Sequence, residues 1–392
     1  MPEIWFWQLI ISPHMADLAV ALAQRDCKVT YVVQRTMSDD RARQGWTAPA
    51  LPGIALQLAD TIESVQRLVQ LAPADSIHVG QGVRANGLVG LAQSALAKRG
   101  LRQWVVMETV NDSGWRGVLK RAEYSRIFRV RGKSLQGVLA TGHRTADWVV
   151  ARGMQAERVY PFAYFLPDDK SPVETSQRES GPFRFVFAGR LISLKRVDWL
   201  INALGSLRDQ AFELWVVGTG SEEAALQTLA ESKLGNRIRW LGQLPLPDVP
   251  AVLAQADCLV LPSIHDGWGA VASEALMVGT PVVCSNACGV AGVVQASGLG
   301  GVFPVNDRLA LLQLLTSQMA YGPISDATRR NLTGWATCLG ANAGSLYLQK
   351  IFEFTEFNTG VRPSTPWLAL KNYGIEQAYK VEILSEPSYE NR

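Results

Sequence analysis

The sequence has no excess of charge of either sign. Its 392 residues contain 38 Lys and Arg against 35 Asp and Glu, which gives a formal net charge of +3 at pH 7. A balance of this kind provides no overall electrostatic attraction to nucleic acid, and no recognition motif for nucleic acid accompanies it. We therefore expect no nucleic-acid partner. The length favours two domains, each with a sizeable core.

Cysteines and long apolar runs are also scarce. The five cysteines are scattered, and Cys27, Cys258 and Cys284 lie in apolar, strand-like surroundings. This is typical of buried thiols in a reducing compartment, and no His or Cys pair completes a metal site around Cys284 and Cys288. No apolar run approaches the roughly 18–20 residues of a membrane-spanning helix, and the N-terminus lacks the basic start of a signal peptide. We expect a cytoplasmic protein.

Short apolar runs instead alternate with helical patterns. The runs that predict buried strands are 4–11, 28–33, 76–80, 103–107, 137–141, 183–188, 213–217, 237–241, 257–261 and 281–284. The helical patterns lie near 14–25, 61–71, 84–98, 117–128, 143–152, 195–208, 221–232, 247–255 and 270–278. Continuous apolar strands alternating with helices indicate parallel sheets that are covered on both faces. The predicted fold class is α/β.

The strand–helix series is interrupted once. Residues 165–183 are polar, contain proline and show no apolar periodicity, which predicts an interdomain linker. We expect two Rossmann-like, doubly wound domains, over 1–165 and 166–344, which face a central cleft at the carboxyl ends of their strands. Helical patterns dominate from about 305 to 357, and the mixed tail 358–392 has no assigned role.

One stretch of the second half, LPSIHDGWGAVASEALMVGTPVV, carries the strongest chemical signal. After a strand, Gly267 and Gly269 permit close backbone approach. A helix then begins near Ala270, and its first N–H groups can receive a phosphate or sugar oxygen. Glu274, one turn further, can accept two hydrogen bonds from a vicinal diol such as a ribose. The alternative is that Glu274 only complements the helix dipole.

Two further strand ends support a nucleotide site. Gly189 and Arg190 follow one strand, and Lys195 comes five residues after Arg190, so two cations can grip a diphosphate. The alternative is ordinary solvated charge. Gly218 belongs to a Gly-Thr-Gly turn after the next strand, but the turn does not continue as a dinucleotide fingerprint and no Walker lysine follows. NAD and ATP hydrolysis are therefore not expected.

Taken in order, the blocks AGRLISLKRVDWLI, LWVVGTGSEEAAL, IRWLGQLP and LAQADCLVLPSIHDGWGAVASEALMVGTPVV resemble the donor domain of retaining glycosyltransferases of family 4, which have the GT-B architecture. The resemblance covers residues 183–284. It implies that Arg190 and Lys195 bind the diphosphate of a nucleotide sugar and that Glu274 holds its ribose. Asp266 occupies the first Glu position of the Glu-x7-Glu motif, near the donor sugar, with a shorter side chain. That departure leaves the sugar preference open.

The resemblance also assigns roles to whole sets of residues. The catalytic set that it implies is Arg190, Lys195 and Asp266. The donor-binding set is Gly189, Gly218, Gly267, Trp268, Gly269, Ala270 and Glu274. Arg239, Leu241 and Gly242 resemble the segment around the nucleobase, and residues from about 345 to 392 would return to the first domain. The donor would be a UDP- or GDP-sugar, and cations would replace Mg²⁺, so no metal or other cofactor is expected.

The first domain gives weaker signals. Polar residues at its strand ends are acceptor-side candidates: His14, Glu108, Asn111 and His143. Helix capping is the alternative, because Ser12 and Pro13 suit the start of a helix, and Asp112 and Thr141 suit caps equally well.

A basic stretch at 115–133 stands apart from these. It interleaves aromatic and aliphatic residues with cations, among them Arg116, Lys120, Arg121, Arg126 and Arg129. Such a helix suits an anionic membrane surface or a lipid-linked diphosphate acceptor, and an ordinary solvated face is the alternative. A peripheral position at the inner membrane face therefore stays open.

The predicted function is a retaining, metal-independent glycosyltransferase of the hexosyltransferase type. It would move a sugar from a nucleotide sugar to a glycan or lipid-linked acceptor in polysaccharide biosynthesis. Two alternatives remain: a sugar-nucleotide epimerase of the same architecture, and a non-catalytic subunit that binds sugar nucleotides, which the replacement of Glu by Asp266 motivates.

Overall fold

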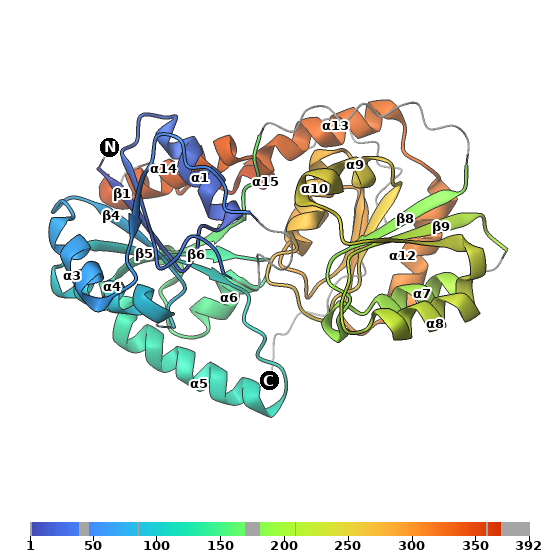
Figure 1. The fold of residues 1–392 in the computed structure, drawn as a ribbon, viewed down its shortest axis with the longest axis horizontal. Helices are drawn as coiled ribbons and strands as arrows, with labels where there is room; N and C mark the ends of the chain where they lie inside the picture. The colour runs from blue at the N-terminus through green and yellow to red at the C-terminus, as the bar shows by residue number, and fades with distance from the viewer. Residues whose placement is uncertain are drawn as a thin grey trace.

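The computed structural model describes residues 2–38, 47–84, 86–168, 181–207, 209–357 and 360–369. Two parallel sheets, one of seven strands and one of six, lie side by side with helices on their faces (Figure 1). The predicted α/β class with two Rossmann-like units is confirmed. Because most of the strands are buried on both faces, they are the near-continuous apolar runs seen in the sequence.

The first sheet has the order β3-β2-β1-β4-β5-β6-β7. Its strands are β1 (Ile4–Gln8), β2 (Val29–Val33), β3 (Ala55–Leu58), β4 (Ile77–Gln81), β5 (Arg102–Glu108), β6 (Leu135–Thr141) and β7 (Val159–Phe162). The helices of this part are α1 (Pro13–Ala23), α3 (Ile62–Leu71), α4 (Gly87–Lys98), α5 (Gly114–Arg131) and α6 (Thr145–Val150). Helix α1 begins with Ser12 as N-cap and Pro13 in its first turn, as the sequence predicts, although no side-chain cap hydrogen bond forms.

The second sheet has the order β10-β9-β8-β11-β12-β13. Its strands are β8 (Phe183–Ala188), β9 (Phe212–Val217), β10 (Ile238–Gly242), β11 (Cys258–Leu261), β12 (Val282–Ser285) and β13 (Gly300–Phe303). The helices are α7 (Val197–Gly205), α8 (Glu223–Leu234), α9 (Val249–Ala254), α10 (Ala270–Met277), α11 (Ala291–Ser297), α12 (Arg308–Tyr321), α13 (Asp326–Ala336), α14 (Ala341–Phe357) and α15 (Pro366–Ala369).

All ten predicted strands form, and three further strands were missed. β3 is largely exposed, β7 contains Pro161, and β13 begins with two glycines, so none has a continuous apolar run. The first predicted strand is too long, because β1 ends at Gln8. The helix predicted from 195 begins only at Val197, and Lys195 lies in the 3₁₀ turn before it.

Only the two ends of the predicted linker at 165–183 lie within the described residues. Residues 169–180 lie outside the described residues, but Phe165 and Leu166 at its start are buried. Leu166 forms a parallel bridge with Gly340, and its carbonyl accepts the N–H of Ala341 at 2.8 Å. The chain that leaves β7 therefore packs against the start of α14 as core.

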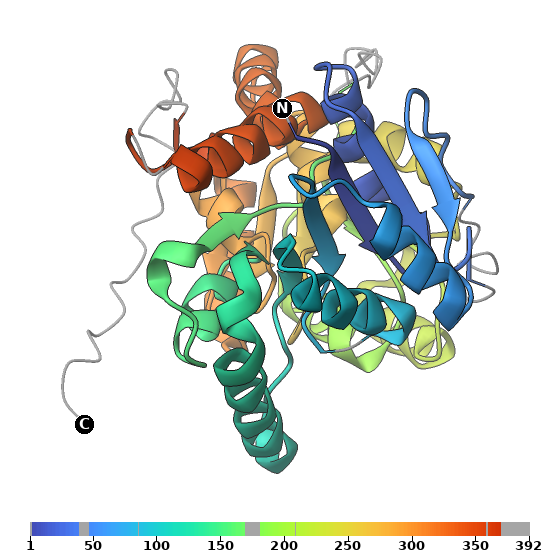
Figure 2. The ribbon, with the colours of Figure 1, turned by 90° about the vertical axis from the view of Figure 1, so that its left-hand side faces the viewer.

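Helix α14 lies on the first domain beside α1 (Figures 1 and 2). The hydroxyl of Tyr347 donates to the carbonyl of Pro161 at 3.0 Å, and Gln349 Nε2 donates to the sulfur of Cys27 at 3.1 Å. Further along the helix, Glu356 forms an ion pair with Arg102 at 3.1 Å. These contacts join the C-terminal helix to strands and helices more than 180 residues earlier.

All five cysteines are buried thiols that form no disulfide among the described residues, as the sequence predicts. Burial raises the pKa of the Cys338 thiol to about 12, so it stays protonated and unreactive at neutral pH.

Two helical glycines give a test of this packing. A Cβ on Gly344 in α14 would lie 2.3 Å from the ring of Phe165, whereas a Cβ on Gly334 in α13 would meet nothing within 4 Å. We expect Gly344→Ala to lower stability by about 1–3 kcal/mol because the core is overpacked. Gly334→Ala should leave stability unchanged or raise it by up to about 1 kcal/mol through helix propensity. Thermal unfolding of both variants checks this, and equal melting temperatures would contradict it.

Candidate functional site

The carboxyl ends of the two sheets meet through their loops. The backbone N–H of His143, which follows β6, donates to the carbonyl of Gly289 at 2.7 Å. A Cβ on Gly292 would lie 2.8 Å from Nδ1 of His143, and a Cβ on Gly142 would lie 3.1 Å from the carbonyl oxygen of Gly267. His143 is thus a contact between the two domains at the edge where such folds bind ligands.

The loop after β11 brings an acid and a cation together. Nζ of Lys195 lies 2.5 Å from Oδ2 of Asp266, and each side chain is 18% exposed. The backbone of Asp266 is fixed, because its N–H donates to Ala287 at 3.2 Å and its carbonyl accepts the N–H of Gly289 at 3.0 Å. Two residues that the sequence placed 71 positions apart therefore form one polar centre that solvent still reaches.

Helix α10 begins directly after this loop. Trp268 is buried, its indole N–H donates to Oγ of Ser273 at 3.1 Å, and its carbonyl accepts the N–H of Val290 at 2.8 Å. Gly269 caps the helix with φ of +89°, a conformation that favours glycine. The N–H of Ala272 donates to the carbonyl of Gly269 at 2.9 Å, whereas the N–H groups of Ala270 and Val271 lie too early in α10 for a partner within the helix. Glu274 lies one turn along and is half-buried.

The two upstream glycines have a packing role. Gly218 has φ of +125°, and a Cβ there would lie 2.0 Å from the carbonyl oxygen of Gly189. The loop after β9 therefore rests on the loop after β8, and Leu191 donates its N–H to Thr219 at 2.9 Å. Arg190, between these contacts, is exposed and forms no ion pair with any residue in the described ranges. Its guanidinium is thus available at the site edge.

The residues expected near a nucleobase lie at different positions along β10. Arg239 lies in mid-strand, where its guanidinium is 3.7 Å from Glu213 and 6.0 Å from the centre of the Trp215 ring. Gly242 lies at the carboxyl end of β10, and its carbonyl accepts the N–H of Gly218 at 2.7 Å. Gly242, with Leu241 directly before it, is therefore at the edge that carries the other predicted donor residues, whereas Arg239 lies three positions earlier in the strand.

Glu108 of the first domain reaches the same loop, and Tyr164 links Glu108 to His14. The hydroxyl of Tyr164 donates to Oε1 of Glu108, and a Cβ on Gly267 would lie 2.3 Å from Oε2 of Glu108. The ring of His14 stacks on Tyr164, with centroids 4.9 Å apart and planes 15° apart. Tyr164 was missed in the sequence, because it stands in the aromatic run YPFAYF with no polar motif around it.

His265 was also missed as a site residue, although it precedes Asp266. Burial lowers the pKa of its imidazole. The charge of Asp266 raises this pKa, and that of Lys195 lowers it. From the first domain, Glu108 raises it and Lys120 lowers it, each more weakly. Charged groups of both domains therefore surround His265, which is half-buried between them.

Asn111 has a local role. Its Oδ1 accepts the N–H of Ser113 at 3.3 Å and the Ser113 hydroxyl at 2.8 Å, and its carbonyl accepts from Lys120 at 2.5 Å. The amide oxygen of this acceptor-side candidate is thus used at the start of α5.

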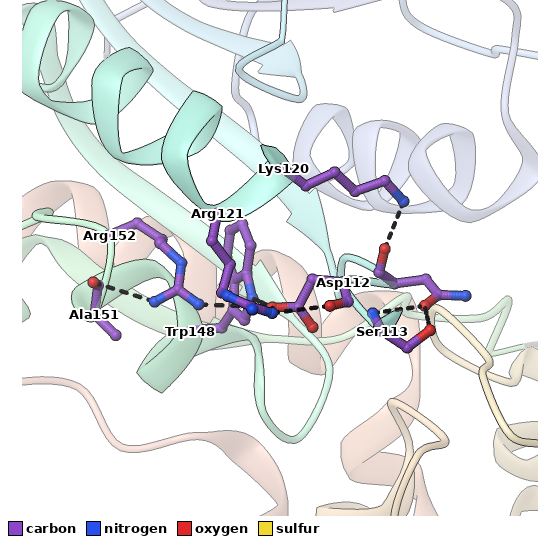
Figure 3. Close-up of polar contacts among 8 residues, drawn as sticks. Asp112, Ser113, Lys120, Arg121, Trp148, Ala151 and Arg152 are labelled. Atoms are coloured by element: carbon purple, nitrogen blue, oxygen red, sulfur yellow. Dashed lines mark hydrogen bonds and ion pairs between the residues drawn. The ribbon is translucent and has the colours of Figure 1, made fainter. Parts of the chain in front are cut away.

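The carboxylate of Asp112 contacts two neighbouring cations, as Figure 3 shows. Its Oδ2 lies 3.2 Å from Arg121 and 3.6 Å from Arg152, and accepts the indole N–H of Trp148 at 2.9 Å. Burial alone would raise the pKa of the Asp112 carboxyl, but the hydrogen bonds from Trp148 and Arg121 outweigh it and hold the pKa below its ordinary value.

The cations of the basic stretch consequently fall into two groups. Lys120 and Arg121 hold the loop before α5, whereas Arg116, Arg126 and Arg129 are exposed. Apolar side chains share the exposed face: Trp115, Val118, Leu119 and Val130. Figure 2 shows that α5 projects from the body of the molecule.

Three further observations concern the rest of the described structure. A separate groove of about 820 Å³ lies between α14 and residues 360–369, and no predicted site residue lines it. Within the described residues, no group of three or more His, Cys, Asp or Glu side chains is arranged to hold a metal ion. No helix in that part of the chain is both long and apolar enough to cross a membrane.

Comparison with known proteins gives a family match in the second domain. The model of the family described as "Glycosyl transferases group 1" matches residues 171–331. The 2-deoxystreptamine glucosyltransferase of Streptomyces kanamyceticus is 31% identical over 177 residues, which are 41% of this chain and 45% of the relative. The D-inositol 3-phosphate glycosyltransferase of Pseudarthrobacter chlorophenolicus is 27% identical over 61% of each chain. The chain thus matches roughly half the length of these relatives.

Solved structures extend the likeness to the whole fold. HepE of Anabaena in complex with UDP superposes with a TM-score of 0.68 at 16% identity, over 90% of this chain and 99% of that one. The lipopolysaccharide outer core galactosyltransferase WaaB in its apo form gives 0.65 at 16% identity, over 91% and 99%. The family match thus lies in the second domain, and the solved structures share the two-domain GT-B fold.

Proposed function

We propose that this chain is a retaining glycosyltransferase of the hexosyltransferase type. It moves a sugar from a nucleotide sugar to a glycan or lipid-linked acceptor in polysaccharide biosynthesis. The observation that carries the proposal is the Lys195–Asp266 pair beside the start of α10, with Glu274 one turn further, inside the segment that matches the family model. One relative is the amylovoran biosynthesis glycosyltransferase AmsK of Erwinia amylovora, 27% identical over 176 residues.

The donor that we propose is a UDP-sugar, with a GDP-sugar as the alternative. Solved complexes of HepE contain UDP and UDP-glucose, and HepE shares this fold. In this chain, Glu274 would hold the two ribose hydroxyls, and the diphosphate would lie between Arg190, Lys195 and the first N–H groups of α10.

The chemistry follows from this placement. The bond between the anomeric carbon and the diphosphate oxygen breaks, and its electron pair leaves with the diphosphate. Arg190, Lys195 and the α10 N-terminus stabilise the negative charge that grows there. The acceptor oxygen attacks from the same face, and its proton passes to the leaving phosphate. In this proposal no protein base and no metal ion is needed, because fixed cations supply the electrostatic stabilisation.

A second proposed contact is with an anionic lipid surface. The outward face of α5 combines Trp115, 71% exposed, with other apolar side chains and with Arg116, Arg126 and Arg129. Apolar groups with interleaved cations suit the headgroup region of a bilayer or a lipid-linked diphosphate. We propose a cytoplasmic enzyme that works at the inner face of the membrane.

Release of nucleoside diphosphate tests the function against its alternatives. Release from UDP-glucose or another sugar nucleotide that rises with added acceptor supports transfer. Interconversion of the sugar nucleotide without acceptor would instead show an epimerase. Saturable binding without turnover in the presence of lipid-linked acceptors would show a non-catalytic subunit, which the replacement of Glu by Asp266 motivates. The relatives named above are transferases, which disfavours the epimerase.

Two substitutions separate binding from chemistry. Glu274→Ala should weaken the affinity for the nucleotide sugar about tenfold or more, because a carboxylate that accepts ribose hydroxyls is lost. Lys195→Ala should lower kcat about 10²–10³-fold with a smaller effect on affinity, because the charge on the leaving group is stabilised mainly in the transition state. Calorimetric titration and steady-state kinetics measure the two effects.

Matched controls are an acid and a cation outside the site. Asp326 is exposed in the first turn of α13, and Lys233 is exposed in the last turn of α8. Asp326→Ala and Lys233→Ala should leave both quantities unchanged. If Glu274→Ala and Lys195→Ala behaved like these controls, the site assignment would be wrong.

Vesicle binding tests the surface of α5. The double variant Arg126→Ser, Arg129→Ser should bind phosphatidylglycerol vesicles about 30-fold more weakly than the parent chain, because each basic residue near an anionic surface contributes roughly 1 kcal/mol. Lys98→Ser, Lys233→Ser removes the same charge from exposed positions elsewhere and should not weaken binding. Sedimentation with vesicles measures both, and an equal loss in the two variants would contradict a specific surface.

A further inference from the structure

Glu108 lies where the two domains touch. It is the last residue of β5, it is exposed, and its Oε2 lies so close to Gly267 that a Cβ there would be 2.3 Å away. Gly267 directly follows Asp266, which pairs with Lys195 in the second domain. A carboxylate from each domain therefore flanks one bare glycine.

We infer that Glu108 contacts the sugar of the bound nucleotide sugar and that Tyr164 positions it. The inference rests on the proposed function, and it moves Glu108 from the acceptor side, where the sequence placed it, to the donor sugar. Sugar hydroxyls donate hydrogen bonds, and carboxylate oxygens accept them. A hexose held beside Asp266 lies next to the glycine that Glu108 covers.

Tyr164 fixes the direction of the carboxylate. Its hydroxyl donates to Oε1 of Glu108, which leaves Oε2 toward Gly267. Its ring is stacked on His14 at 4.9 Å, so the phenol has little freedom to turn away. Tyr164 thus acts through Glu108 and is a positioning residue.

The surrounding charges agree with this placement. The imidazole of His265 interacts electrostatically with Asp266 and Lys195 on its own domain and with Glu108 and Lys120 on the other. These charged groups therefore converge around His265, which is itself half-buried. A polyhydroxy ligand satisfies such a mixture of donors and acceptors better than an apolar one.

The test compares the affinity for a nucleotide with that for its sugar conjugate. UDP and GDP are titrated first, and then UDP-glucose, UDP-galactose, UDP-N-acetylglucosamine and GDP-mannose, to find the conjugate that binds most tightly. Tyr164→Phe keeps the ring on His14 and removes only the hydroxyl. We expect Tyr164→Phe and Glu108→Ala each to weaken the conjugate about tenfold and to leave the free nucleotide unchanged.

A double variant and a control separate positioning from general damage. If Tyr164 acts through Glu108, adding Tyr164→Phe to Glu108→Ala should cause no further loss. Tyr347→Phe removes a comparable hydroxyl, which donates to the carbonyl of Pro161 at 3.0 Å, and should change neither affinity.

The outcomes are distinct. Unchanged affinity for the conjugate in both single variants, equal weakening of nucleotide and conjugate, or additive losses in the double variant would overturn the assignment of Glu108 and Tyr164 and leave the proposed function standing. A parent chain that binds none of these nucleotides or conjugates would overturn the proposed function, and this assignment with it.

Discussion

The close approach of backbone to backbone at glycine is the constraint on which the site depends. Gly218 lies on the carbonyl of Gly189, and Gly289 lies on the carbonyl of Gly267, where a Cβ would be only 2.0 and 2.1 Å away. No other residue leaves this space, so the loops after β8, β9, β11 and β12 can be drawn together only with glycine at these positions. Between these two pairs of loops, the N–H of Ile264 donates to the carbonyl of Leu194 at 2.9 Å, and Lys195 and Asp266 lie 2.5 Å apart.

The arrangement of charge follows from that packing. The second domain supplies cations and an open helix start, which suit a diphosphate, and the first domain supplies Glu108 across the gap. Helix α14 lies on the first domain, and Leu166 pairs with Gly340 just before this helix. The chain therefore crosses between the domains twice near the pairing of Leu166 with Gly340. A change in the distance between domains would therefore act on Glu108 and Gly267 directly.

The sequence predicts the fold well where strands are continuous apolar runs. It fails at β3, β7 and β13, because an exposed edge, a proline and a pair of glycines hide the pattern. Asp266 and Glu274 could be proposed as donor residues from the sequence, because they are close in the chain and precede or begin a helix. Tyr164 could not be proposed in this way, because the role that we infer for it comes from its contact with Glu108, 56 positions earlier, which no local pattern encodes.

The basic stretch at 115–133 is a second case in which the sequence alone does not distinguish residues with different contacts. Composition alone treats Lys120 and Arg126 alike, whereas folding commits Lys120 to the carbonyl of Asn111 and leaves Arg126 exposed. Which cation is available depends on the face of α5 that meets the loop at Asp112, and that requires tertiary structure.

A crystal structure with a bound UDP-sugar is the most direct measurement of the central claim. The account predicts the diphosphate between Arg190, Lys195 and the first turn of α10, with the ribose hydroxyls on Glu274. A nucleotide bound instead in the groove between α14 and residues 360–369, or anywhere away from α10, would contradict it.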